Sequence, residues 1–461
     1  METMSKAIPK RAGFLKNSTL VILVFATAFF PRLVETIGAP APINFLHFAT
    51  VPFAAALVLT KSRVRDRHQI QIVWQLLVGL LFLLTAIVAS AFLNDAGGIN
   101  AVLAFLLLGE PFILLIALVG LPLSAKSFTS FQTWIRRFCL FHVFLAIAQR
   151  YILRFDLKPT GMEPPDNIQG VFFLSGAGHV VGTSVSLSFG IYYFFTAKDV
   201  PLYFRALVML AAFTHMLAAD GKQVLLFLGV AWLLLVLIKL KDIAKAIQYV
   251  AGGIVFGYGF FWCMQNIEAF ASFNTWIRPE LYGPEGEATR LKFASLRIIP
   301  TYYESVLNGL FGLGPGHTVG RLGGWMLREY AGLLNPLGAT SHDASRAVWQ
   351  AVGESWLGSQ SSMFSPLFGW AGIWGDLGFI GLGAYLWLAY VVWHHLCLDD
   401  ISKLLLLSIF VSGLIFSQME EPGYMLSIAM LIGLRWQEHR MSHQAQAVIH
   451  PDHALASSVV Q

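Results

Sequence analysis

Long apolar runs recur along most of this chain, and they constrain its fold more than any other feature. Many of them approach the roughly 20 residues that a helix needs to cross the hydrocarbon core of a membrane. Only 12% of the residues are charged and 56% are hydrophobic, whereas a soluble domain carries about a quarter charged residues. We therefore predict an all-α polytopic membrane protein and exclude a large soluble protein with buried helices.

About twelve segments fit transmembrane helices by length and hydropathy. They are residues 18–36, 43–60, 70–93, 99–121, 138–154, 171–195, 203–219, 223–240, 247–265, 366–392, 402–418 and 422–437. This division predicts an N-terminal segment (1–17), nine helices (18–265), an outer block (266–363), three further helices (364–440) and a polar, disordered tail (441–461). The outer block combines turn-forming stretches with short segments of helical periodicity, so we expect it to be mostly helical.

The distribution of basic residues predicts which side each loop faces. Loops that fall on one side carry Lys and Arg repeatedly, for example at 61–67 and 126–137, whereas the short loops at 37–42, 94–98 and 419–421 carry none. Because basic loops stay in the cytoplasm, both termini should be cytoplasmic and the outer block should face away from it. In a bacterium this places the protein in the inner membrane with a periplasmic block.

Several other classes of protein or site are disfavoured by the sequence. The basic residues are spread over short loops, which fits membrane topology better than nucleic-acid binding. The three cysteines, Cys139, Cys263 and Cys397, show neither metal-ligand spacing nor a disulfide framework. No Asp or His ligand set is clustered, so we expect no metal and no cofactor. The basic N-terminus precedes an apolar run without a small-residue cleavage site, which predicts an uncleaved first helix.

Four basic residues on the outer side are candidates to bind a phosphate group: Lys222, Arg290, Arg297 and Arg321. Lys222 lies in a tight turn between two apolar segments, where it would otherwise serve as an interfacial anchor. Arg290 and Arg297 are seven residues apart and would share one face of a helix. The alternative for this pair is a solvated amphipathic helix on the membrane surface.

Three titratable residues are candidates for acid or base chemistry. His317 follows the glycine-rich turn GLGPG, and His342 is the other histidine of the outer block. The alternative for each is a structural role, which is the more common one for a lone histidine. Asp376 is a carboxylate near the outer end of an apolar segment, where an ionisable group is costly and tends to be functional or paired.

Glu110 is an acidic residue in the middle of a predicted transmembrane segment. Such a group needs a partner or a function. Arg32, Arg150 and Arg154 lie towards the outer ends of their segments and are the candidate partners. A structural ion pair is the interpretation that we favour for Glu110.

The order of these features resembles that of the O-antigen polymerase and O-antigen ligase family of bacterial polysaccharide enzymes. The resemblance rests on EATRLKFASLRIIPTYYESVLNGLFGLGPG at 287–316, on GDLGFIGL at 375–382 and on NIQGVFFLSGAGHVVG at 167–182. It departs from the family pattern in two places. Lys222 stands where the family usually has Arg, and Ser365-Pro366 occupies the slot of a motif that contains a histidine.

The resemblance implies a metal-independent glycosyltransferase that acts on undecaprenyl-pyrophosphate-linked oligosaccharide repeat units at the periplasmic face. Lys222, Arg290, Arg297 and Arg321 would hold the pyrophosphate, and His317, His342 or Asp376 would assist the acceptor hydroxyl. The implied partners are the lipid-linked glycan, a glycan acceptor and a chain-length regulator or other assembly proteins.

Three alternatives remain open from the sequence. The first is a ligase that transfers the glycan to lipid A-core. The second is a transporter or flippase of glycans, although such proteins often contain inverted repeats and none is evident here. The third is a non-catalytic assembly partner of a polysaccharide synthase.

Overall fold

The computed structural model describes residues 16–61, 66–158, 163–173, 177–240, 243–271, 273–274, 278–358 and 362–449. Within these ranges every regular element is helical and no residue is in a strand, which confirms the prediction of an all-α chain. Most of the predicted segment 1–17 and residues 450–461 of the predicted tail lie outside the described ranges. Residues 441–449 belong to the last helix rather than to a disordered tail.

A helix occupies each of the predicted transmembrane segments. These helices are α1 (Asn17–Phe29), α2 (Pro31–Thr36), α3 (Leu46–Lys61), α4 (Arg67–Leu93), α5 (Gly98–Gly120), α6 (Ala125–Tyr151), α7 (Gly178–Thr196), α8 (Leu202–Ala218), α9 (Lys222–Ile238), α10 (Ile243–Asn266), α19 (Gly369–His395), α20 (Asp400–Ile415) and α21 (Pro422–Ile449). The first predicted segment is divided into α1 and α2 at Pro31, which cannot continue the hydrogen bonds of the preceding helix.

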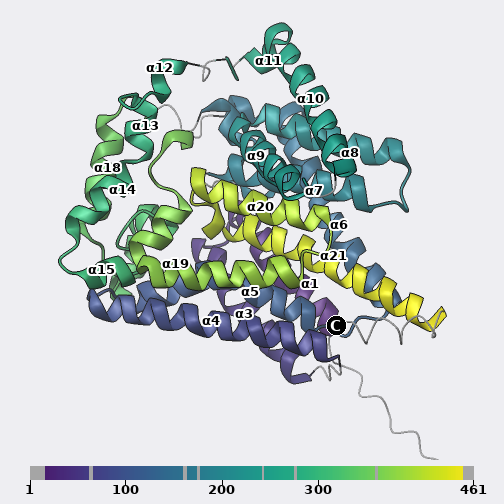
Figure 1. Cartoon of the computed structure of the whole chain (residues 1–461), viewed down its shortest axis with the longest axis horizontal. Coiled ribbons are helices and arrows are strands. Elements are labelled where there is room, and N and C mark those ends of the chain that lie inside the picture. The colour runs from purple at the N-terminus through teal and green to yellow at the C-terminus, as the bar shows by residue number, and fades with distance from the viewer. Residues whose placement is uncertain are drawn as a thin grey trace, which may run out of the picture.

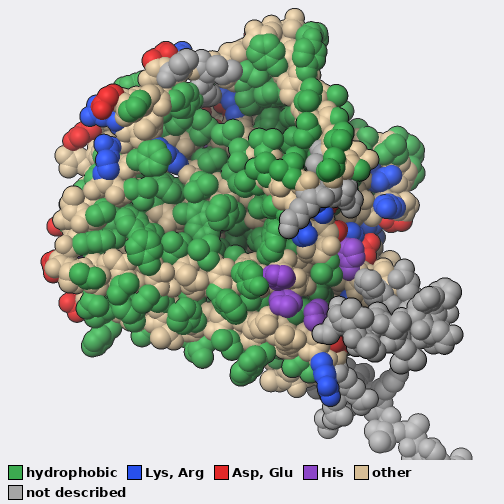
Figure 2. All heavy atoms as spheres, viewed as in Figure 1, with side chains coloured by type: hydrophobic (Ala, Val, Ile, Leu, Met, Phe, Trp, Pro, Cys, Tyr) green, Lys and Arg blue, Asp and Glu red, His purple; other side chains and the backbone are tan. Residues whose placement is uncertain are grey.

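Five helical stretches in the described part of the chain are long and apolar enough to cross a membrane, by length and composition: Ala41–Lys61, Arg67–Leu93, Gly98–Gly120, Ile247–Asn266 and Gly369–His395. The outward face of α4 is typical of a lipid-facing helix, because large apolar side chains such as Trp74, Leu81 and Phe92 are exposed on it. Figure 2 shows the same pattern over the visible surface, where hydrophobic side chains cover the middle and charged ones gather towards the two ends.

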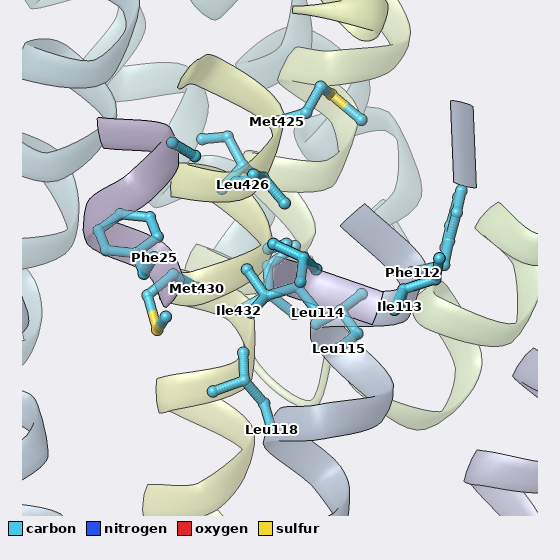
Figure 3. Close-up of a cluster of buried hydrophobic side chains, with 14 of the residues drawn as sticks. Phe25, Phe112, Ile113, Leu114, Leu115, Leu118, Met425, Leu426, Met430 and Ile432 are labelled. Atoms are coloured by element: carbon cyan, nitrogen blue, oxygen red, sulfur yellow. The ribbon is translucent and has the colours of Figure 1, made fainter. Parts of the chain in front are cut away.

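The core of the protein is built around α5 and α21, which pack against each other along their lengths. α5 is almost continuously buried from Leu107 to Gly120. Figure 3 shows how Phe25 of α1 joins side chains from α5 and α21, such as Leu118 and Met430, in one hydrophobic cluster. α10 is the opposite case, because it packs on α9 and only 6% of its apolar stretch, Ile247–Asn266, is buried.

The outer block consists of short helices: α11 (Glu268–Ala271), α12 (Pro279–Tyr282), α13 (Glu287–Lys292), α14 (Ala294–Ile298), α15 (Val306–Phe311), α16 (Leu327–Glu329), α17 (Ala331–Leu334) and α18 (Asp343–Glu354). Figure 1 shows α12 to α15 and α18 at one end of the long helices α4 and α19, with the C-terminus towards the opposite end.

Two of the three short loops that we predicted on the outer side, 94–98 and 419–421, contact this block. Asn308 donates a hydrogen bond to Asn94 (2.9 Å), and the backbone N–H of Gly97 donates to Thr340 (2.9 Å). The backbone N–H of Arg321 donates to Glu420, which lies between α20 and α21 (2.8 Å). These two loops, which carry no basic residue, therefore lie at the same end of the molecule as the outer block.

Glu110 is paired with a residue that we did not predict. Nδ1 of His47 lies 2.8 Å from its carboxylate, and both side chains are buried between α3 and α5. The three arginines that we considered have other partners, since Arg32 pairs with Glu35 and Arg150 and Arg154 pair with Asp156. Glu110 therefore has a buried partner, as we predicted, but this partner is a histidine of the neighbouring helix instead of an arginine.

We expect His47→Leu to destabilise the protein by about 3–5 kcal/mol, because it leaves the buried carboxylate of Glu110 without a partner. His47→Leu combined with Glu110→Leu should recover most of that loss. Unfolding with sodium dodecyl sulfate in mixed micelles would measure both changes. A double variant as unstable as the single one would show that packing, rather than the pair, determines the stability of this site.

Candidate functional site

The glycine-rich turn and the GDLG motif form one structural unit. α19 is interrupted at Gly378, which has φ +63°, and the turn at 312–316 lies against this break. Gly312 has φ +76°, and a Cβ there would be 2.3 Å from the carbonyl carbon of Asp376. The backbone N–H of Leu313 donates to Gly375 (2.8 Å) and that of Gly314 to Asp376 (3.1 Å). Glycine is required here because two backbones meet without room for side chains.

The carboxylate of Asp376 holds this turn in place. It accepts hydrogen bonds from the backbone N–H groups of Gly316 and Thr318, both at 2.8 Å, and from the hydroxyl of Thr318 at 2.6 Å. The side chain is buried, and it does not line the large cavity of the protein. This geometry assigns Asp376 a structural contact with the turn.

Both predicted histidines lie beside the same turn. His317 donates from Nδ1 to the carbonyl of Leu313 (2.8 Å) and accepts at Nε2 from the hydroxyl of Thr340 (2.8 Å). Burial lowers the pKa of His317, which favours this neutral form. His342 caps α18 by accepting from the N–H of Ala344 (3.1 Å), and its ring stacks on His317. Neither histidine lines the cavity described next.

A large cavity of about 1290 Å³ lies between the outer block and the ends of several long helices. It exceeds the roughly 300–1,000 Å³ of typical small-molecule sites. Its walls come from the beginnings of α7 and α9, from α10, from the short π-helical turn η7 (Leu322–Met326), from α18 and from η10 (Gln418–Glu420). Segments that are distant in the sequence thus share one ligand-sized space.

One wall of the cavity carries two side-chain pairs. Nζ of Lys222 lies 3.0 Å from Oδ1 of Asp220, in the turn before α9. Nε2 of His179, at the beginning of α7, lies 3.5 Å from Oδ1 of Asp166 in η3 (Pro164–Asn167). Burial and the nearby carboxylates of Asp220 and Glu163 raise the pKa of Asp166 to about 6. We call Asp166, His179, Asp220 and Lys222 the α7–α9 cluster.

A second polar cluster comes from the outer block and the short loops. Arg321 forms an ion pair with Glu421, and its guanidinium lies 4.5 Å from the ring centroid of Trp325. Arg32 donates to Glu35 (3.0 Å) and to the hydroxyl of Tyr330 (3.2 Å). A guanidinium held by a carboxylate and an aromatic ring is fixed in orientation, as recognition of a phosphate or carboxylate requires.

The cavity changes character away from these charges. One part is lined by apolar side chains of α9 and α10 and by Phe273, including Leu226, Leu233, Phe256 and Phe260. Another part, at the outer block, carries the aromatic side chains of Tyr282, Trp325, Tyr330 and Trp349. The lining of the cavity therefore includes charged, apolar and aromatic parts, which we call the charged centre, the apolar trough and the aromatic wall.

Of the four predicted phosphate-binding cations, two line the cavity and two do not. Lys222 and Arg321 line the cavity, 99 positions apart in the chain. Arg290 and Arg297 are exposed outside it, and Arg297 donates to the backbone carbonyl of Arg290. The helix that they were expected to share is divided at Phe293 into α13 and α14.

The Ser365-Pro366 segment, which occupies the slot of the histidine-containing motif, accepts a hydrogen bond from Lys292. Nζ of Lys292 donates to the carbonyls of Ser365 (3.0 Å) and Ile415 (2.8 Å) and lies 4.6 Å from the ring centroid of Phe368. This buried ammonium fastens the outer block to the end of α20. Ser365 itself lines the cavity.

Several charged residues of the cavity, such as Arg32, Asp166 and Glu421, were not among the predicted site residues. A signal was present for Glu421, because two adjacent acids in the short loop 419–421 of a membrane protein need partners. Asp166 lies in a proline-containing loop that resembles many others, so nothing local distinguishes it.

The described residues contain no group of three or more His, Cys, Asp or Glu side chains that could hold a metal ion. In comparisons with known proteins, no family model matches this chain and no curated protein is significantly similar to it. The geometry of the cavity therefore carries the functional argument.

Proposed function

We propose that this protein is a bacterial inner-membrane glycosyltransferase that polymerises lipid-pyrophosphate-linked oligosaccharide repeat units on the periplasmic face. The observation that carries the proposal is the cavity, which joins a cationic centre to an apolar trough and an aromatic wall. A lipid-linked glycan has three parts of matching chemistry: an isoprenoid tail, a pyrophosphate and a sugar chain.

The charged centre suits a pyrophosphate. α7 and α9 both begin at the cavity, and neither has a side-chain cap at its N-terminus. A helix N-terminus carries a partial positive charge and favours phosphate groups. Lys222 adds a full charge at the beginning of α9, and Arg321 adds a second. A dianionic pyrophosphate would compete well with the single carboxylates that pair with these cations.

The trough between α9 and α10 suits the lipid tail. Its lining is aliphatic and aromatic, and α10 is exposed along most of its length. Because α10 packs mainly through a small surface such as the contact between Trp232 and Gly253, a lipid could enter the trough from the bilayer. Burying an isoprenoid chain there contributes roughly 25 cal/mol per Å² of apolar surface.

The aromatic wall suits the glycan. Aromatic faces stack on the C–H faces of sugar rings, and acidic side chains accept hydrogen bonds from sugar hydroxyls. Trp325, Tyr330 and Trp349 provide the faces, and Glu329 and Glu421 lie among them in the lining. These acids also explain why a cavity for an anion contains carboxylates.

The membrane arrangement follows from the same proposal. We infer about twelve membrane crossings, both termini in the cytoplasm and the outer block in the periplasm. The contacts of the block with the loops at 94–98 and 419–421 support this arrangement. An acceptor hydroxyl then attacks the anomeric carbon, and the cations stabilise the negative charge of the departing pyrophosphate.

Two assays test the proposal. Purified protein should be stabilised against heat by undecaprenyl pyrophosphate, by about 2.7 kcal/mol at a hundredfold excess over Kd, and less by undecaprenol. With lipid-linked oligosaccharide extracted from the producing cells, it should lengthen the glycan. If the protein were neither stabilised by undecaprenyl pyrophosphate nor able to lengthen the glycan, the proposal would be contradicted.

The second assay also separates the alternatives. Transfer only to added lipid A-core would identify a ligase. Movement of the lipid-linked glycan across proteoliposome membranes without new glycosidic bonds would identify a transporter.

A further inference from the structure

The carboxylates that line the cavity differ in what they contact. Asp220 is paired with Lys222, and Glu421 is paired with Arg321. A neighbouring cation favours the ionised carboxylate and weakens it as a base. Glu163 and Glu329 also line the cavity. Asp166 is the carboxylate of the described lining that the structure pairs with an imidazole, that of His179. Its side chain is 30% exposed, so its oxygens are accessible from the cavity.

The surroundings of Asp166 also strengthen it as a base. Burial comes first, and the negative charges of Asp220 and Glu163 add to it, so the pKa of Asp166 is raised to about 6. A general base is most effective when its pKa lies near the working pH. Neither His317, His342 nor Asp376 reaches the cavity, so the base has to come from the cavity lining itself.

We propose that Asp166 is the general base of the transfer reaction and that His179 is its positioning residue. The inference rests on the proposed glycosyltransferase function. Asp166 accepts the proton of the acceptor hydroxyl while that oxygen bonds to the anomeric carbon. The bond from the anomeric carbon to the pyrophosphate oxygen breaks, and the lipid pyrophosphate leaves with the electron pair. Nε2 of His179 lies 3.5 Å from the carboxylate and, as a donor, would hold it towards the acceptor.

This assignment predicts a specific dependence on pH. The rate should fall as the pH falls through about 6, because the protonated carboxyl cannot accept the hydroxyl proton. The charged and titratable groups facing Asp166 are Glu163 on its own loop, His179 on α7, and Asp220 with its partner Lys222 before α9. The fall in rate at low pH is the acid limb of the pH–rate profile. Because Asp166 and His179 interact, the apparent pKa of this limb describes the two residues together.

The decisive experiment measures transfer and binding in parallel with the purified full chain. Asp166→Asn should reduce glycan transfer at least ~100-fold, while its Kd for undecaprenyl pyrophosphate stays within about twofold of the wild-type value or becomes lower. Glu163→Gln is the matched control, because it also converts an acid of this loop to an amide. It should retain transfer at pH 8 and move the acid limb to lower pH.

The outcomes distinguish this inference from the function on which it rests. If the wild type transfers glycan and Asp166→Asn transfers it equally fast, Asp166 is not the base. An acid limb that Glu163→Gln leaves in place would contradict the assignment even if Asp166→Asn failed to fold. If the wild type neither binds undecaprenyl pyrophosphate nor transfers glycan, the proposed function itself is wrong. His179→Gln should slow transfer less than Asp166→Asn does and should alter the acid limb.

Discussion

Replacing Lys222 with methionine should reduce glycan transfer about 100–1,000-fold, as expected for the loss of one preorganised group that stabilises developing negative charge. Lys222 stands at the beginning of α9 and lines the cavity, so its charge adds to that of the helix N-terminus. The fold should tolerate the change, because the partner Asp220 is 47% exposed and can be hydrated when it is left alone. Thermal unfolding of both proteins in the same detergent checks this point.

Arg290→Ala is the control that distinguishes the structure from the sequence pattern. The sequence groups Arg290 with Lys222 as a pyrophosphate ligand, whereas the structure places Arg290 on the exposed surface, outside the cavity. We therefore expect Arg290→Ala to change transfer by less than about threefold. If Arg290→Ala lost much of the transfer activity and Lys222→Met lost little, the anion site would have to be assigned to α13 instead of the cavity. If neither substitution changed transfer, the assignment of a pyrophosphate substrate would fail.

Gly312→Ala should destabilise the protein by about 3 kcal/mol or more. The residue has φ +76°, which costs a non-glycine residue roughly 1–3 kcal/mol. The added Cβ would also meet the backbone of Asp376 at 2.3 Å, and backbone cannot move aside as a flexible side chain can. The expected result is a lower yield of folded protein and a lower melting temperature.

Gly309→Ala provides the comparison for this effect. Gly309 lies three residues earlier, in α15, and a Cβ there would meet nothing within 4 Å. This change should be neutral or slightly stabilising, because alanine has the higher helix propensity. Equal melting temperatures for the two variants would show that the turn at 312–316 adapts, contrary to the close approach of the two backbones.

Some of the predicted site residues line the cavity and others do not, for physical reasons. Lys222 lies in the cavity because a cation at the end of an apolar segment has to reach a polar space. Arg321 lines the same cavity from the outer block. Asp376 satisfied the same criterion of a costly buried charge, yet three hydrogen bonds from the glycine turn occupy it. Hydrogen-bond donors supplied by a backbone 60 residues away are invisible to local pattern. The same is true of His47, the partner of Glu110.

The sequence by itself determined the helical character of this chain and the positions of its long helices. The existence and approximate position of each long helix follow from local hydropathy, because a segment in lipid has to satisfy its own backbone hydrogen bonds. Only the tertiary structure decided which charged residues share a site. Asp166, Lys222 and Arg321 come from three segments that are separate in the sequence, and they line one cavity because α7, α9 and the outer block pack around it. Such packing depends on the shapes of many side chains together, which no local motif records.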